Sequence, residues 1–289
     1  MCDEITEADN ATHLTRRQLG ASAGAVGVAA LLPTAADAQH KAGPVKGRDV
    51  TITTPDGQCD AYFAAPTSGK HPGVLMWPDI MGLRPAFRQM ADRLAGEGYA
   101  VLVVNQFYRS AKSPIVQPGE SFDQPAVRER IMPWRAALTA DAVTRDGTTF
   151  VAFLDQQKEV DTKRHIGTAG YCMGGPMVLR TAAAVPGRVH AGASFHGAGL
   201  VSDTPDSPHL LVPKLAGGYL IAIASNDDAR SPNDKVVLRY AFAAANRPAE
   251  IQVYPDAMHG WCVIDSKVYN RPQAERAWGR MLDLFGKQL

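Results

Sequence analysis

The segment Gly170-Tyr171-Cys172-Met173-Gly174 constrains the fold of this chain more than any other. Residues 165–169 before it predict the end of a short β-strand, and the alanine-rich run 178–184 after it predicts a helix. The chain must therefore turn sharply at Cys172. Glycines two residues to either side permit that turn, because Cβ atoms there would clash with neighbouring strands. This strand–turn–helix pattern, a nucleophile elbow, predicts one exposed side chain at the top of a sheet.

Cys172 occupies the central position of the elbow, where serine is more usual. The N-terminus of the following helix favours a thiolate, so the pattern predicts a reactive thiol. The same glycine spacing with serine at the centre occurs in Gly20-Ala21-Ser22-Ala23-Gly24, but no strand precedes this segment and it lies in a targeting segment. We therefore reject Ser22 as a nucleophile.

A nucleophile in an elbow needs a base, and that base needs an orienting carboxylate; the usual chain order is nucleophile, acid, histidine. Asp227 follows the buried-strand run 218–224, and His259 follows the strand-like run 250–255. Order and position predict Cys172 as nucleophile, Asp227 as acid and His259 as base. Asp228 remains an alternative to Asp227, because the sequence cannot separate adjacent residues.

These features make the chain resemble the dienelactone hydrolase family from about residue 49 to the C-terminus. The resemblance is carried by five blocks: Gly170–Gly175, Asn226–Asp228, His259–Trp261, Pro78–Leu83 and Ala91–Tyr99. It implies a doubly wound, mostly parallel α/β sheet of the α/β-hydrolase type in a single domain. It also implies hydrolysis of a carboxylic ester or lactone through an acyl thioester. The chain differs from the family in two respects. Asp79 stands where the family often has glutamate, and the N-terminal segment predicts export, whereas family members are usually cytosolic.

The oxyanion formed in such a reaction needs backbone donors, which we expect from the N–H groups of Met173 and Ile80. The resemblance implies that Asp79 contacts the resting cysteine and that Arg109 binds a substrate carboxylate. Two other interpretations stay open: Asp79 could cap the helix that begins near Pro85, and Arg109 could be an ordinary surface arginine.

Composition agrees with one globular enzyme domain, since 45% of the 289 residues are hydrophobic and 20% are charged. The formal net charge of +1 argues against nucleic acid or an anionic membrane as partner. A small ester or lactone is the expected partner. We expect no cofactor and no metal, because His259 and Cys262 alone do not make a zinc site.

Residues 1–38 predict a twin-arginine signal peptide. Arg16-Arg17 precede a mildly apolar stretch, 20–32, and Ala36-Asp37-Ala38 forms a cleavage site. The apolar stretch is shorter than the roughly 20 residues that span a bilayer, so stable membrane insertion is not expected. Export by the twin-arginine machinery and cleavage near Ala38 would place the mature domain, residues 39–289, in the periplasm or outside the cell. The alternative is a disordered alanine-rich tail.

Cleavage would remove Cys2 and leave three cysteines. In an oxidising compartment an odd number means at least one free thiol. A disulfide between Cys59 and Cys262, with Cys172 free, is compatible with the sequence.

Strands and helices alternate along the predicted domain. Expected strands span 49–54, 58–65, 73–77, 100–104, 189–195, 218–224 and 250–255, and expected helices span 85–97, 148–158, 178–184, 233–245 and 271–289. Four prolines interrupt residues 111–137, which we interpret as an insertion near the ligand-binding edge of the sheet. We interpret His196-Gly197 as a turn at a strand end.

Two other classes of function compete with ester or lactone hydrolysis. A redox protein could use Cys172 as a peroxide-reactive thiol, but that role leaves Asp227 and His259 unexplained. An inactive hydrolase fold could serve as a binding module, yet each expected catalytic residue is present.

Overall fold

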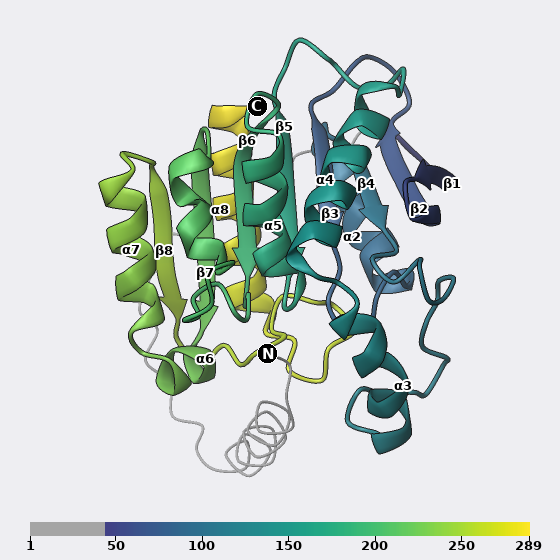
Figure 1. The fold of residues 1–289 in the computed structure, drawn as a ribbon. Coiled ribbons are helices and arrows are strands. Elements are labelled where there is room, and N and C mark those ends of the chain that lie inside the picture. The colour runs from purple at the N-terminus through teal and green to yellow at the C-terminus, as the bar shows by residue number, and fades with distance from the viewer. Residues whose placement is uncertain (1–43) are drawn as a thin grey trace, which may run out of the picture.

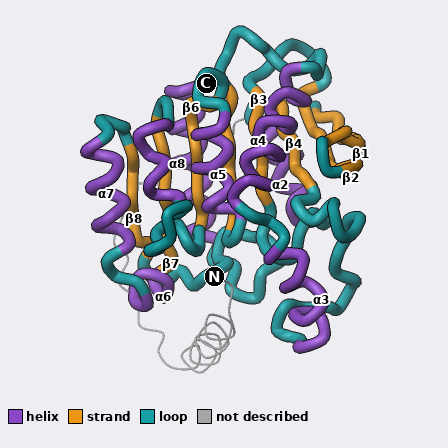
Figure 2. Tube along the Cα trace, in the orientation of Figure 1, coloured by secondary structure: helices purple, strands orange, loops and turns teal. Residues whose placement is uncertain are grey.

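The computed structural model describes residues 44–289, which form an eight-stranded sheet between two layers of helices (Figures 1 and 2). The predicted signal peptide and its cleavage site lie outside the described residues, and export stays a prediction. Across residues 44–289, none of the helices combines the length and apolarity needed to cross a bilayer.

The sheet has the order β1-β2-β4-β3-β5-β6-β7-β8. Its strands are β1 (Val45–Thr54), β2 (Gly57–Pro66), β3 (Gly73–Trp77), β4 (Ala100–Val104), β5 (Ile166–Tyr171), β6 (Val189–Phe195), β7 (Gly218–Ala224) and β8 (Ala249–Tyr254). β1 and β2 form an antiparallel hairpin, β2 pairs antiparallel with β4, and the remaining pairs are parallel. The predicted α/β-hydrolase type of sheet is thereby confirmed.

Helices cover both faces of this sheet because its central strands are apolar on both sides. They are α2 (Pro85–Gly96), α3 (Pro125–Ala136), α4 (Ala140–Asp155), α5 (Gly174–Ala184), α6 (Ser225–Arg230), α7 (Asp234–Ala244) and α8 (Arg271–Gln288), with a 3₁₀ helix, η1 (Pro208–Lys214). Side chains of α4, α5 and α7 pack into one core on one face, whereas α2 and α8 supply a second core on the other.

One expected helix has a different first residue in the structure, and a short helix follows β7. The helix expected at 148–158 begins eight residues earlier, because Thr139 caps α4 by accepting a hydrogen bond from the Ala142 N–H at 3.2 Å. The residues after β7 form the short helix α6, which carries Asp227 and Asp228 in its first turn.

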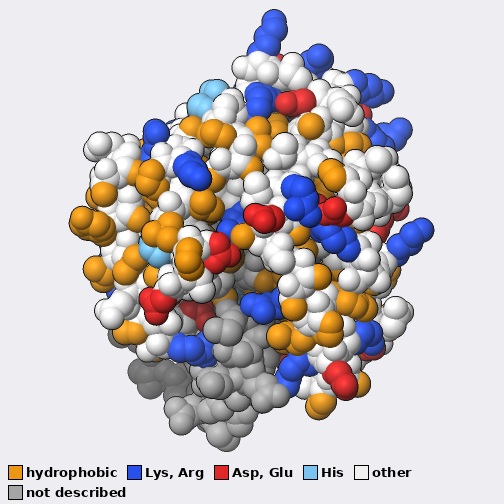
Figure 3. Space-filling view, viewed as in Figure 1, with side chains coloured by type: hydrophobic (Ala, Val, Ile, Leu, Met, Phe, Trp, Pro, Cys, Tyr) orange, Lys and Arg blue, Asp and Glu red, His pale blue; other side chains and the backbone are white. Residues whose placement is uncertain are grey.

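The parallel strands end together at the lower edge of the sheet in Figure 1, where α3 and α6 also lie. Loops that follow β3, β5, β7 and β8 therefore meet at one place, which is where ligands bind in sheets of this kind. The face in Figure 3 carries Lys and Arg interspersed with Asp and Glu, without one continuous basic surface on that face.

Candidate active site

Cys172 lies at the tight turn between β5 and α5 that the sequence predicts. Its backbone has φ of +53°, a left-handed value that is uncommon outside glycine and is found at strained functional positions. The turn is held by the Cys172 N–H, which donates to the Phe195 carbonyl at 3.0 Å, and by the Cys172 carbonyl, which accepts from Gly175 at 3.0 Å. Contrary to the exposed position predicted from the sequence, Cys172 is buried, with 2% of the residue exposed, and it lines a pocket.

Three glycines around Cys172 stand where no side chain fits. A Cβ atom on Gly170 would lie 2.1 Å from the Gly174 carbonyl oxygen, and one on Gly174 would lie 2.4 Å from the Trp77 carbonyl oxygen. A Cβ on Gly175 would come within 2.5 Å of Gly197 Cα. Helix α5 therefore packs against the neighbouring strands and loop at backbone distance.

We expect Gly170→Ala to lower the free energy of unfolding by about 3 kcal/mol, because the clash is with backbone that cannot move aside. Gly187→Ala is the matched control, since no atom lies within 4 Å of a Cβ placed there. Urea unfolding of both variants checks this. Equal stability of the two variants would contradict the close approach at the elbow.

Asp227 and His259 meet across the ends of β7 and β8. His259 Nδ1 lies 2.7 Å from Asp227 Oδ2, and the imidazole side chain is only 3% exposed. With the Nδ1 proton directed to the carboxylate, Nε2 keeps its lone pair and can accept a proton. His259 also lines the pocket with Cys172.

Residues of α6 that precede Asp227 fix the contact between Asp227 and His259 by binding the loop after β8. Asn226 Oδ1 accepts from the His259 backbone N–H at 2.8 Å, and the Ser225 N–H and hydroxyl both donate to the Ala257 carbonyl. Asp228 points elsewhere and holds Lys235 Nζ at 2.5 Å. Of the two adjacent acids, the structure brings Asp227 to the histidine.

Of the two residues expected to supply backbone donors, one is next to Cys172 in the chain and the other lines the same pocket. Met173 follows Cys172 directly at the start of α5, and Ile80 lines the pocket from the loop after β3. Gln106, fully buried, donates from Nε2 to the Asp79 carbonyl at 2.7 Å. That carbonyl shares its peptide plane with the Ile80 N–H, so the bond fixes the direction of that N–H. No sequence motif marks Gln106 for this role.

The pocket above Cys172 has a volume of about 610 Å³. One wall comes from residues 114–123, within the proline-rich segment 111–137. The other walls come from the loops after β3, β6 and β8. Apolar side chains of this lining include Ile80, Met81, Val116, Phe122 and Val268.

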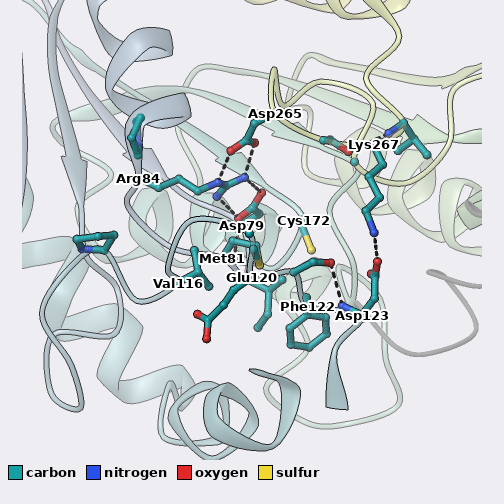
Figure 4. A pocket seen from close by; sticks show the side chains of 18 of the residues that line it. Asp79, Met81, Arg84, Val116, Glu120, Phe122, Asp123, Cys172, Asp265 and Lys267 are labelled. Atoms are coloured by element: carbon teal, nitrogen blue, oxygen red, sulfur yellow. Dashed lines mark hydrogen bonds and ion pairs between the residues drawn. The ribbon is translucent and has the colours of Figure 1, made fainter. Parts of the chain in front are cut away.

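Asp79 lies in the pocket wall, bound to Arg84 (Figure 4). Arg84 Nη1 and Nη2 donate to its two carboxylate oxygens at 2.7 and 2.9 Å, and the Met81 N–H donates to Oδ1 at 2.9 Å. Burial alone would lower the pKa of Arg84, but the charge of Asp79 and the bonds to Asp265 and Asp79 outweigh it and raise the pKa. Asp79 does not cap α2, whose N-cap residue is Arg84 itself.

Arg109 lies outside the pocket, contrary to the role implied for it. Its guanidinium donates to both carboxylate oxygens of the buried Asp146 at 2.8 Å and to Asp56. These contacts tie the turn between β1 and β2 to α4. Arg84 and Asp265 also line the pocket, but they lie outside the sequence blocks that carry the family resemblance, so no motif marked them.

His196, which the sequence predicts to lie in a turn at a strand end, lines the pocket. It follows β6 with φ of +41°, and its ring meets that of His259 edge to face with centroids 5.0 Å apart. Both ring nitrogens are buried without a hydrogen-bond partner among the described residues. Burial lowers the pKa of His196 well below its usual 6.5, and the neighbouring His259 adds to this, so the ring stays neutral.

A neutral buried histidine makes stability depend on pH. Below about pH 6.5 the unfolded chain binds a proton at residue 196 that the folded chain does not bind. The free energy of unfolding therefore decreases as the pH is lowered. We expect wild type to lose about 1 kcal/mol more than His196→Phe between pH 6.5 and 5.5, because the unfolded histidine is already half protonated at pH 6.5. Urea unfolding across this range checks it. Parallel curves for the two proteins would show that His196 is protonated in the fold.

Cys59 and Cys262 are both free thiols in the structure, so the disulfide considered from the sequence is not formed. Cys59 belongs to the core on the α4 and α5 face, whereas Cys262 belongs to the core on the α2 and α8 face. The sheet therefore separates them. Burial raises the pKa of each thiol, which keeps both protonated and poorly reactive. Within residues 44–289, no group of three His, Cys, Asp or Glu side chains is placed to hold a metal ion.

Solved structures share this architecture. A "Putative Dienelactone Hydrolase" from Klebsiella pneumoniae aligns with a TM-score of 0.73 and 24% identity, covering 85% of this chain and 100% of that one. Dienelactone hydrolase from Anabaena variabilis aligns with a TM-score of 0.61 and 15% identity, covering 85% of this chain and 99% of that one. The likeness shows the fold, which is that of the α/β-hydrolases.

A sequence model of the dienelactone hydrolase family matches residues 59–289. The chain therefore belongs to the dienelactone hydrolase family and is a hydrolase. A "Putative carboxymethylenebutenolidase" from Salmonella typhi is 28% identical over 252 residues, which are 85% of this chain and 88% of that protein. The carboxymethylenebutenolidase of Rhodococcus opacus is 26% identical over 229 residues, 78% of this chain and 85% of that protein.

Proposed function

We propose that this protein hydrolyses a carboxylic ester or lactone with Cys172 as nucleophile, His259 as general base and Asp227 as the group that orients His259. One observation carries the proposal. Asp227 holds His259 at 2.7 Å, and that histidine lines the same pocket as the cysteine of the elbow. Family membership supports ester or lactone hydrolysis as the reaction class.

The acylation step requires Cys172 in its reduced form: His259 Nε2 takes the proton of the thiol, and the sulfur attacks the carbonyl carbon. The carbonyl oxygen becomes an oxyanion, which the N–H groups of Met173 and Ile80 stabilise by about 3 kcal/mol each. The C–O bond then breaks, and His259 returns its proton to the departing oxygen. An ester releases an alcohol, whereas a lactone keeps the new hydroxyl on the acyl chain.

In the deacylation step His259 takes a proton from water, and the hydroxide oxygen attacks the thioester carbonyl. The C–S bond breaks, the thiol regains a proton from His259, and the carboxylic acid leaves. Asp227 stabilises the imidazolium formed in each step and holds its tautomer. Because the Gln106 side chain fixes the Asp79–Ile80 peptide, the Ile80 donor is oriented before substrate arrives.

The acyl thioester is the intermediate that tests this proposal. Mixing the protein with excess 4-nitrophenyl butanoate and quenching with acid within milliseconds should trap a butanoyl group, which adds its mass to the peptide that contains Cys172. Peptide mass spectrometry locates it. A steady turnover with the acyl group on another residue, or with no acylated peptide at any quench time, would overturn Cys172 as nucleophile.

A further inference from the structure

We infer that this pocket accepts esters or lactones without a charge and discriminates against those that carry a carboxylate. The inference rests on the proposed function and adds the substrate class. Its basis is that the buried cation of the pocket, Arg84, is already fully used by groups of the protein.

Arg84 has five N–H donors, and each has an acceptor. Nε and one Nη2 hydrogen go to Asp265 at 2.7 and 2.8 Å, and the other Nη2 hydrogen goes to Asp79 at 2.9 Å. Nη1 donates to Asp79 at 2.7 Å and to the Gly82 carbonyl at 3.1 Å. Since a guanidinium offers no sixth donor, a substrate carboxylate could bind Arg84 only by displacing one of these acceptors.

Figure 4 shows the arrangement: the Arg84 guanidinium lies between Asp79 and Asp265, and Cys172 lines the same pocket. The Arg84 side chain is 8% exposed and that of Asp79 is 12% exposed, so this ion pair is poorly accessible to water. Asp265 is 46% exposed at the outer side of the same guanidinium. The cation is thus sandwiched between two protein anions.

The other charged residues of the pocket also favour an uncharged substrate. Lys267 is held by Asp123 at the pocket wall, and Glu120 is held by Arg130. Among the described residues that line the pocket, four are carboxylates (Asp79, Glu120, Asp123 and Asp265) and two are cations (Arg84 and Lys267). When Arg130, the partner of Glu120, is counted as well, the carboxylates still exceed the cations by one.

An anionic substrate would therefore exchange water for a pocket with excess negative charge and apolar walls. Burying a charge without a partner is unfavourable, whereas an uncharged ester loses little on entry. Arg109 cannot supply the missing cation, because Asp146 and Asp56 hold it outside the pocket. The apolar side chains of Val116, Phe122 and Val268 offer contact to an uncharged acyl or alkoxy group.

A matched pair of substrates tests this inference. The 4-carbamoylphenyl and 4-carboxyphenyl esters of butanoic acid have nearly the same shape and differ by one charge. We expect wild-type kcat/KM to be at least about tenfold higher for the uncharged ester, after division by each ester's rate of hydroxide hydrolysis. Equal or faster turnover of the carboxylate ester would overturn the inference.

Two variants separate the role of Arg84 from the general field of the pocket. Asp265→Ala opens the Nε donor and one Nη2 donor, and we expect it to reduce the preference for the uncharged ester at least tenfold. Glu120→Ala removes the same charge from the pocket wall but leaves the five acceptors of Arg84 in place, so we expect less than a threefold change. Equal changes in the two variants would contradict the role of the saturated guanidinium.

Binding gives a readout that does not depend on turnover. Calorimetry with 4-hydroxybenzamide and 4-hydroxybenzoate should show tighter binding of the uncharged compound to wild type and a smaller difference in Asp265→Ala. Binding of the benzoate alone, or of neither compound at millimolar concentration, would overturn the inference. Failure of Cys172 to become acylated would instead overturn the proposed function and leave the charge preference to be decided by binding.

Discussion

Cys172→Ala should lower kcat/KM for an activated aryl ester by about 10⁴-fold or more. Alanine has no atom that can attack the carbonyl, so no acyl intermediate forms, and only binding and the backbone donors remain. The measurement is the initial rate of 4-nitrophenolate release, corrected for the rate without protein. An uncharged lactone assayed in parallel extends the test to lactone hydrolysis.

The control for Cys172→Ala is its stability. Residue 172 has φ of +53°, which alanine tolerates about as poorly as cysteine, so the midpoint of thermal unfolding should change by only a few degrees. Cys172→Ser keeps an attacking atom and should retain more activity than alanine. An alanine variant that keeps a tenth of wild-type activity would exclude this cysteine from the reaction.

Asp227→Asn should lower kcat by about 10³ to 10⁴-fold. The amide cannot stabilise the imidazolium, and its NH₂ group can favour the wrong tautomer of His259. The expected loss applies at every pH, because the amide has no charged form to recover. Rates measured from pH 5 to 9 check both the size of the loss and whether it is the same at every pH.

The adjacent acid provides a closely matched control. Asp228 carries the same side chain one residue later on the same short helix, but it binds Lys235 and not His259. Asp228→Asn should therefore change kcat less than about threefold. If the two variants lost activity equally, the loss would reflect damage to α6 and not the orientation of the histidine.

The order of elements and the elbow could be predicted from the sequence because they depend on local signals. The glycines around Cys172 and the apolar runs of β6 and β7 depend on the residues themselves and their neighbours. The choice between Asp227 and Asp228 could not be made this way. It depends on the direction of side chains at the start of α6, which is set by the contacts of Ser225 and Asn226 with the loop after β8.

Charged residues of the pocket were the least predictable part of the site. Arg109 follows β4 at the expected edge of the sheet, yet its guanidinium forms an ion pair with the buried Asp146 of α4. Arg84 meets Asp265 across 181 positions of sequence, and no short-range pattern signals such a pair. His196 resembled a turn because its neighbour is glycine, whereas its placement against His259 depends on the packing of three strand ends.

The proposed chemistry and the lining of the pocket come from separable parts of the chain. Residues 114–123 line one wall, whereas Cys172, Asp227 and His259 are fixed by the sheet and the helices next to it. Residues 111–137 could therefore be exchanged as one unit between related proteins, in evolution or by protein engineering. Such chimaeras would be a direct way to redirect this enzyme to new esters, because the swap alters the shape of the pocket and leaves the reacting groups in place.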